Sequence, residues 1–94
     1  MNILAILVEF LGTFIFLSVI VATGSPWMIG LTLIVLVYLG GSVSGGHFNP
    51  AVTVMTLANR GIAGDNAAAY ILAQVAAGVA AVTVYNQLKK QGVL

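Results

Sequence analysis

A helix start in the middle of the chain constrains the fold more than any other feature. Asn49 and Pro50 directly follow a long apolar segment, and a second apolar run extends from Pro50 to Asn59. Asparagine suits the N-cap of a helix, and proline suits its first turn, where the missing N–H costs nothing. The run has 10 residues, about 15 Å of helix, which is half of a bilayer core of about 30 Å. Because half-helices in a membrane need protein or a watery cavity around them, we expect residues 44–59 to form a re-entrant loop and half-helix beside a cavity.

Three other segments are apolar and long enough to cross a bilayer, at about residues 3–22, 27–43 and 67–88. The chain is 61% hydrophobic and 5% charged, whereas about a quarter of the residues of a water-soluble domain are charged. We therefore predict an all-α, multi-pass integral membrane protein. Residues 1–94 are expected to form a single membrane domain with three transmembrane helices and one re-entrant half-helix, and Asp65 is expected to cap the last helix.

Several classes of function are excluded by the polar residues. The formal net charge is only +1, too little for a nucleic-acid interface. The chain has no cysteine, which excludes disulfides and thiol chemistry. Its one histidine, His47, has no cysteine or aspartate nearby in the sequence, so we predict no metal site.

Glu9 and Gln74 are polar residues within the predicted spans. A carboxylate at that depth costs several kcal/mol unless it has partners, and the irregular segment 45–48 is the nearest supply of free N–H groups. Gln74 offers both donors and acceptors to the same segment. We therefore expect Glu9 and Gln74 to brace the re-entrant loop. A proton-relay role for Glu9 is the competing interpretation, but the first span holds no second titratable residue that could take the proton.

Three stretches of the sequence resemble the aquaporins, the major intrinsic protein family. Glu9–Phe14 is similar to the signature of the family's first helix, Ser44–Thr53 to its signature loop, and Ala69–Gln74 to the start of its third helix. The resemblance covers nearly the whole chain and corresponds to the N-terminal half of the family. The chain departs from the family pattern in having one Asn-Pro-Ala motif instead of two and three spans instead of six.

In that family two mutually inverted halves form one pore, and the resemblance implies the same roles for the matching residues here. Asn49 would donate its side-chain N–H groups at the centre of the pore, and two facing helix N-termini would oppose cations. Conduction would be passive, so we expect neither an enzyme nor a cofactor. The expected pore signature is Asn49, Pro50 and Ala51, and the carbonyls that would line the pore belong to Gly45, Gly46, His47 and Phe48.

An antiparallel homodimer is the simplest way to complete such a pore, with the chain inserted in both orientations and up to four such pairs in one assembly. The basic residues permit this arrangement. Arg60 would lie on one side of the membrane while Lys89 and Lys90 lie on the other, so the positive-inside rule gives no strong preference for one orientation. The expected partners are therefore an inverted copy, the lipid bilayer and small neutral solutes.

The narrow selectivity ring of the family can be counted from the Asn of each half. The count implies Ile29 from one copy and Val37, Gly46 and Val52 from the other. Val52 stands where the family usually has an arginine, so the ring is expected to be apolar. We therefore expect a channel for water and small neutral solutes such as glycerol.

Two other functions remain open at this point. The chain could be a non-conducting half-channel that associates with a full-length aquaporin and modulates its assembly. It could also be a small proton-coupled exporter centred on Glu9, although such an exporter has no use for an Asn-Pro-Ala loop.

Overall fold

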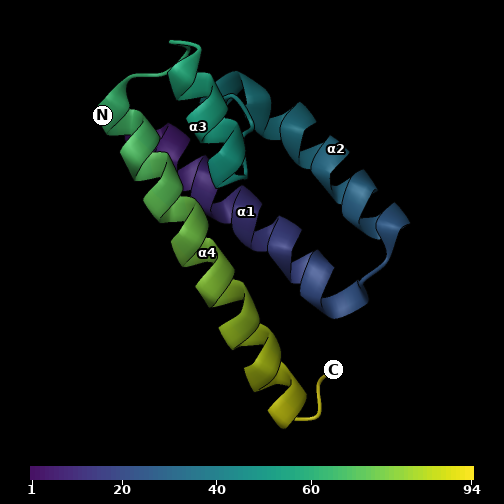
Figure 1. The fold of residues 1–94 in the computed structure, drawn as a ribbon. Coiled ribbons are helices and arrows are strands. Elements are labelled where there is room, and N and C mark those ends of the chain that lie inside the picture. Colours follow the sequence, from purple (N-terminus) through teal and green to yellow (C-terminus); the bar gives the residue numbers. More distant parts are fainter.

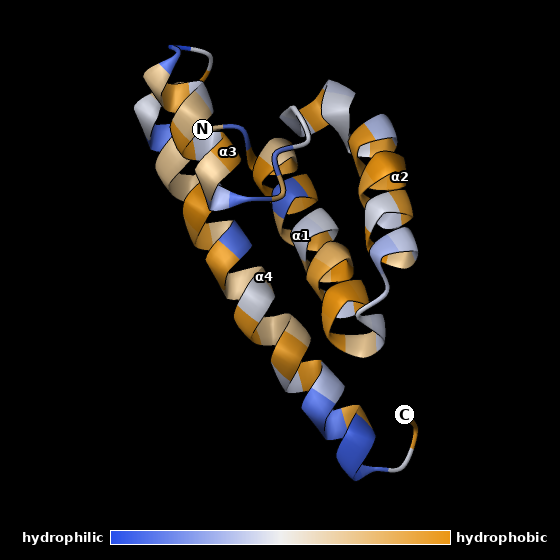
Figure 2. Cartoon of the chain, turned by 45° about the vertical axis from the view of Figure 1, so that its right-hand side comes forward, coloured by the Kyte–Doolittle hydropathy of each residue, from blue (hydrophilic) through white to orange (hydrophobic).

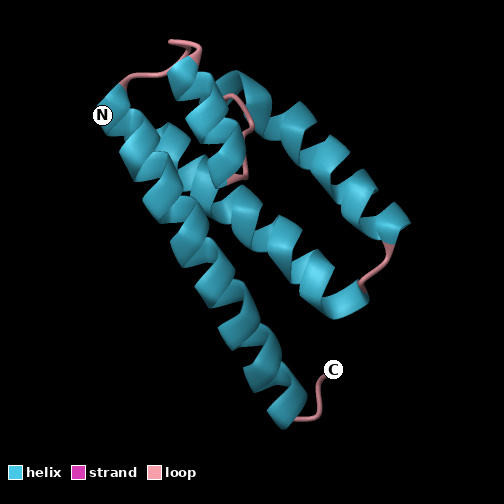
Figure 3. Cartoon of the chain, in the orientation of Figure 1, coloured by secondary structure: helices cyan, strands magenta, loops and turns pink.

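The structure is a computed structural model that describes all of residues 1–94. It contains four α-helices and no strands, with loops only between the helices and at the chain ends (Figure 3). Three helices are long and apolar enough to cross a membrane, whereas α3 has only 9 residues. The prediction of an all-α fold with three membrane-length helices and one short helix is confirmed. The bounds are α1, Ile3–Thr23; α2, Pro26–Ser44; α3, Pro50–Ala58; and α4, Gly64–Lys90.

Local signals set most of the helix ends. Asn2 caps α1, with its side-chain oxygen 3.0 Å from the N–H of Ala5. Ser25 caps α2, and Pro26 occupies its first position, where no N–H is needed. The observed long helices extend one to three residues beyond most of the predicted ends of the spans.

The predicted cap of α4 is wrong. This helix begins at Gly64 with Ala63 as its N-cap, and no side chain makes a capping hydrogen bond. Asp65 lies inside the first turn, where its carboxylate accepts a hydrogen bond from the N–H of Asn66 at 2.9 Å. Because the helix begins one residue before Asp65, this residue lies within the first turn and cannot be the N-cap.

The helices form an open layer with α1 at its centre. One side of α1 packs against α4 and the other against α2, while α3 packs against α4 (Figure 1). Helices α1 and α4 run in the same direction, and the N–H of Asn2 donates to the side-chain oxygen of Asn66 at 3.0 Å where both begin. The chain therefore crosses the layer three times, and its termini lie at opposite ends of the molecule (Figure 1).

Polar residues lie inside the molecule and large apolar residues lie outside. Only 13 of the 94 residues are buried, and the buried apolar set consists mostly of alanines at the α1–α4 contact, where small residues let helices approach closely in lipid. Exposed large apolar residues occur along α1, α2 and α4, and most of the strongly hydrophilic segments lie near the helix ends and in the loops (Figure 2). This distribution fits a chain whose surrounding solvent is hydrocarbon. The buried polar residues are Glu9, Thr13, Ser44, Thr53 and Gln74.

Candidate functional site

The loop between α2 and α3 turns the chain back toward the end of the molecule from which it came. Gly45 and Gly46 have φ values of 89° and 65°, and Phe48 also has a positive φ of 53°. The loop descends from the end of α2, and α3 then rises back to the same end (Figure 1). As predicted, Asn49 is the N-cap of α3, accepting from the N–H of Ala51 at 2.7 Å, and Pro50 occupies the first position. The 9 residues of α3 extend about 14 Å, too short to span a bilayer.

Glu9 lies at the centre of the site and is 0% exposed. One carboxylate oxygen accepts from the Ser44 hydroxyl at 2.7 Å and from the His47 N–H at 3.0 Å. The other accepts from the Phe48 N–H at 2.7 Å and from the Gln74 side-chain amide at 2.9 Å. Four donors thus surround one buried carboxylate, and the fold brings Glu9 and Gln74 together against the loop.

Thr53 and Tyr70 also hold the loop, a role that the sequence did not indicate individually. The Thr53 hydroxyl accepts from the Gln74 amide at 2.9 Å and lies 2.8 Å from Nδ1 of His47. The Tyr70 hydroxyl donates to the carbonyl of Ser44 at 2.7 Å, and its ring packs edge-on against His47. Tyr70 and Thr53 both lie in stretches that resemble the family, and Tyr70 is also at helical spacing from Gln74, but neither signal indicates what their hydroxyl groups bind.

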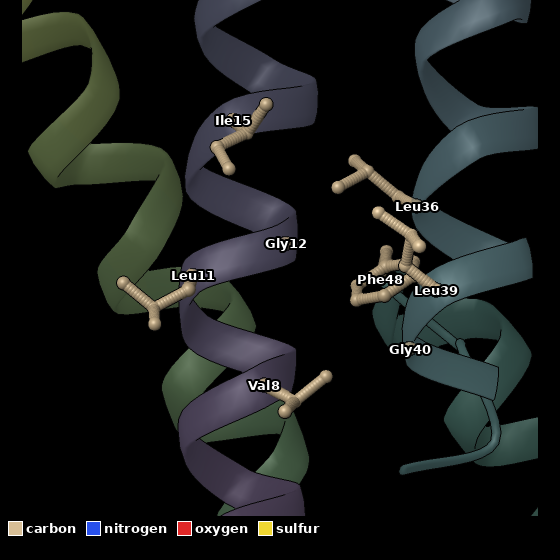
Figure 4. A pocket seen from close by; sticks show the side chains of 8 residues that line it. All are labelled: Val8, Leu11, Gly12, Ile15, Leu36, Leu39, Gly40 and Phe48. Carbon is tan, nitrogen blue, oxygen red and sulfur yellow. The ribbon is translucent and has the colours of Figure 1, made fainter. Parts of the chain in front are cut away.

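Phe48 anchors the loop between α1 and α2. Its side chain is 2% exposed and packs where both helices carry glycine: a Cβ added at Gly40 would lie 3.1 Å from the Phe48 ring, and one added at Gly12 would overlap that ring. The ring lies beside an apolar groove of about 210 Å³ between the two helices (Figure 4). The groove is lined by Val8, Leu11, Gly12, Ile15, Leu36, Leu39, Gly40 and Phe48.

In the loop backbone, the N–H groups are hydrogen-bonded within the chain but the carbonyl groups are not. All four N–H groups of residues 45–48 donate within the chain: Gly45 to the carbonyl of Gly41, Gly46 to the Ser44 hydroxyl, and His47 and Phe48 to Glu9. The four carbonyl oxygens of the same residues accept no hydrogen bond from the chain. The loop therefore presents four consecutive free acceptors, and such groups are costly in an apolar environment without water or another donor.

Asn49 adds donors beside these acceptors. Its side-chain oxygen is used to cap α3, whereas its side-chain NH₂ group makes no hydrogen bond within the chain. The residue is exposed. Acceptors and a donor are thus presented together next to the N-terminus of α3, where the helix dipole is positive.

The residues of the expected selectivity ring are only partly brought together. Gly46 packs against α2, where an added Cβ would lie 3.4 Å from Cα of Val37. Val52 lies half-buried in the first turn of α3. Ile29 lies near the opposite end of α2, about 12 Å along the helix from Val37. One copy of the chain therefore does not bring all four residues together.

Comparison with known proteins agrees with this arrangement. Residues 20–93 match the family described as major intrinsic protein. The chain belongs to the major intrinsic protein family. Together with its three membrane-length helices, this membership makes it a multi-pass integral membrane protein.

The relatives that it matches are named as glycerol facilitators and aquaporins. It is 45% identical to glycerol uptake facilitator protein-like 6 of Lactiplantibacillus plantarum, over 80% of this chain and 39% of that protein. It is 35% identical to aquaporin Z of Photorhabdus laumondii, over 81% of this chain and 39% of that protein. It is 33% identical to the probable aquaporin PIP2-7 of Oryza sativa, over 93% of this chain and 37% of that protein. The chain thus spans less than two fifths of the length of these relatives. No solved structure matches it.

Proposed function

We propose that the chain forms a passive channel for water and small neutral solutes, with the pore enclosed by two mutually inverted copies. The observation that carries the proposal is the row of four free carbonyls at residues 45–48, next to the free NH₂ group of Asn49. A file of water or polyol molecules needs acceptors at regular steps and a donor that reorients it. This loop supplies both.

An inverted second copy would supply the missing wall. One chain is an open layer in which α2 contacts only α1 among the helices, and its four loop carbonyls accept no hydrogen bond from the same chain. A two-fold axis in the membrane plane would place a second α3 opposite the first, with the two positive N-termini facing each other. That arrangement would repel cations at the centre of the pore.

The exporter hypothesis is disfavoured by the surroundings of Glu9. A proton carrier must exchange its proton with water on each side of the membrane in turn, but Glu9 is 0% exposed. Its two oxygens already accept from four donors. The carboxylate is therefore placed to hold the loop rather than to release and bind protons.

Asn49→Asp separates the pore role of this residue from its role as a helix cap. Aspartate caps helices as well as asparagine does, so α3 should still form, but the NH₂ donor is lost and a negative charge takes its place. In proteoliposomes that contain only this chain, we expect the osmotic water permeability above that of empty liposomes to fall at least tenfold, about 1.4 kcal/mol of barrier. The measurement is stopped-flow light scattering.

Asn59→Asp is the matched control, because Asn59 follows the other end of α3 and the same chemical change there should leave permeability unchanged. Equal permeability in the wild type and Asn49→Asp would contradict the pore role. Liposomes with wild-type chain that are no more permeable than empty ones would favour a half-channel that works only with a full-length relative.

The orientation of the copies can be tested separately. Since the chain has no cysteine, a single cysteine introduced at Gly64 or at Gln91 can report on which side of the membrane that residue lies. Labelling of each cysteine from one side alone would exclude the inverted pair.

Val52→Arg tests the expected ring. In the proposed pair, Ile29 of one copy meets Val37, Gly46 and Val52 of the other, and an apolar ring of this kind should pass glycerol as well as water. A guanidinium is larger than the valine side chain and strongly hydrated by comparison, so we expect Val52→Arg to reduce glycerol uptake at least tenfold and water flux much less. Val54→Arg, on an exposed part of the same helix, is the control. A wild-type channel that passes water but no glycerol would refute the apolar ring.

A further inference from the structure

A second apolar groove lies between α1 and α4, toward the C-terminal end of both helices. It has a volume of about 240 Å³ and is separate from the loop of the proposed pore. The two helices pack closely near Glu9 and Gln74 and diverge toward the end where α4 stops (Figure 1). The groove opens where they separate and is lined by Phe14, Ser18, Ala22, Ala81, Val84, Tyr85, Leu88 and Leu94.

The side-chain charges at this end of the molecule are all positive. The chain has five charged residues: Glu9 is buried in the centre, and Arg60 and Asp65 lie at the opposite end, around the α3–α4 loop. Lys89 and Lys90 occupy the last turn of α4, which is hydrophilic in Figure 2, and the two acidic residues of the chain lie elsewhere. No acidic side chain therefore neutralises the pair.

One of these cations lies at the rim of the groove. The ammonium nitrogen of Lys89 is 5.7 Å from the centre of the Tyr85 ring, and Tyr85 itself lines the groove. A positive group thus lies next to an apolar groove that opens on the outer surface of a membrane-spanning helix pair. This combination matches a molecule with a negative head and an apolar tail.

We propose that this groove binds an anionic phospholipid, with one acyl chain between α1 and α4 and the phosphate at Lys89 and Lys90. The depth is consistent, because lysines at the end of a spanning helix lie in the headgroup region while the groove extends toward the hydrocarbon. Apolar contact in the groove supplies affinity for any lipid tail, and the two lysines supply the preference for negative headgroups. The proposal concerns the outer surface of the chain and does not depend on conduction.

Native mass spectrometry of the purified chain in a neutral detergent tests the site. The probes are dioleoyl phosphatidylglycerol and dioleoyl phosphatidylcholine, which share their acyl chains and differ in headgroup charge. We expect the anionic lipid to bind about tenfold more tightly, since each lysine near a negative headgroup contributes up to about a fivefold gain. In Lys89→Gln/Lys90→Gln the preference should fall below about twofold, whereas Arg60→Gln, at the other end, should keep it.

A second pair of variants tests the groove itself. Ala22 is exposed at the groove, so Ala22→Phe should fill the groove without disturbing the core. We expect it to weaken the binding of both lipids severalfold. Ala68 is exposed near the opposite end of α4, and Ala68→Phe should leave the binding of both lipids unchanged. Equal binding of the two lipids by the wild type would overturn the proposal, as would loss of the preference in Arg60→Gln. Unchanged binding by Ala22→Phe, or displacement of the lipid by glycerol 1-phosphate at matched concentration, would show that no acyl chain occupies the groove and would overturn it too.

Discussion

Glu9→Gln is expected to destabilise the folded chain by about 3 kcal/mol. Each carboxylate oxygen of Glu9 accepts from two donors, so whichever oxygen is replaced by NH₂, two donors lose their acceptor and face another donor. A buried donor left without an acceptor costs about 1–3 kcal/mol. In either case one of the two donors is a backbone N–H of the loop, that of His47 or that of Phe48, and the other is the side chain of Ser44 or of Gln74. Reversible unfolding in mixed micelles, followed by circular dichroism, measures the change in the free energy of unfolding.

Asp65→Asn provides the matched control for this prediction. It makes the same carboxylate-to-amide change at an exposed residue whose carboxylate accepts only from the adjacent N–H of Asn66. Surface substitutions of this kind change stability by about 0.5 kcal/mol or less. If the two variants were destabilised equally, Glu9 would not be the residue that holds the loop.

Gly12→Ala is expected to destabilise the chain by about 3 kcal/mol, at the upper end of the range for overpacking a core. The added Cβ would overlap the Phe48 ring, with Cδ1 only 2.6 Å away. That ring borders the groove between α1 and α2, but its residue is only 2% exposed and its own N–H is bound to Glu9, which limits how far it can move. Either α1 must move away from α2 or the loop must shift, and both changes would also disturb the carbonyl row. The same unfolding measurement applies.

Two variants distinguish overpacking from a general effect of replacing glycine in a helix. Gly30→Ala places a Cβ where no atom lies within 4 Å, and it should be neutral or stabilising by up to about 1 kcal/mol. Gly12→Ala/Phe48→Ala removes the ring that is in the way and should be more stable than the sum of the single changes predicts. A Gly12→Ala chain as stable as Gly30→Ala would show that the close contact at Phe48 is not present in the membrane.

Much of the fold could be predicted from the residues because its signals are local. The three long helices follow from apolar length, and the start of α3 follows from the Asn49–Pro50 pair, whose capping geometry needs only neighbouring residues. The need of Glu9 for donors follows from the cost of a carboxylate in an apolar segment. The cap of α4 was missed because Gly64 gave no positive signal for a helix start.

The contacts that form the candidate site were harder to predict from the sequence than the helices. The contributions of Ser44, Thr53 and Tyr70 join segments 21 to 35 residues apart in sequence. No spacing rule relates residues at such separations, because their meeting depends on how α1, α2 and α4 pack. The need of Glu9 for donors pointed to the N–H groups of residues 45–48, but it did not indicate that those of His47 and Phe48 are the two that it accepts from.

The sequence by itself determined that this chain is a membrane protein with three spanning helices and one half-helix. Few backbone conformations are stable in hydrocarbon, and the lengths of the apolar segments and the Asn-Pro pair select among them. The sequence also predicted that Glu9 would accept from the N–H groups of the loop, but only the tertiary structure decided which of them it takes and which groups hold the others. Glu9 reaches the N–H groups of His47 and Phe48 across separations of 38 and 39 residues, while those of Gly45 and Gly46 bind at the end of α2. The four N–H groups of the loop are all bound within the chain while its four carbonyls accept no hydrogen bond from it, and this separation of donors from acceptors exists only once α1 packs against α2 and α4.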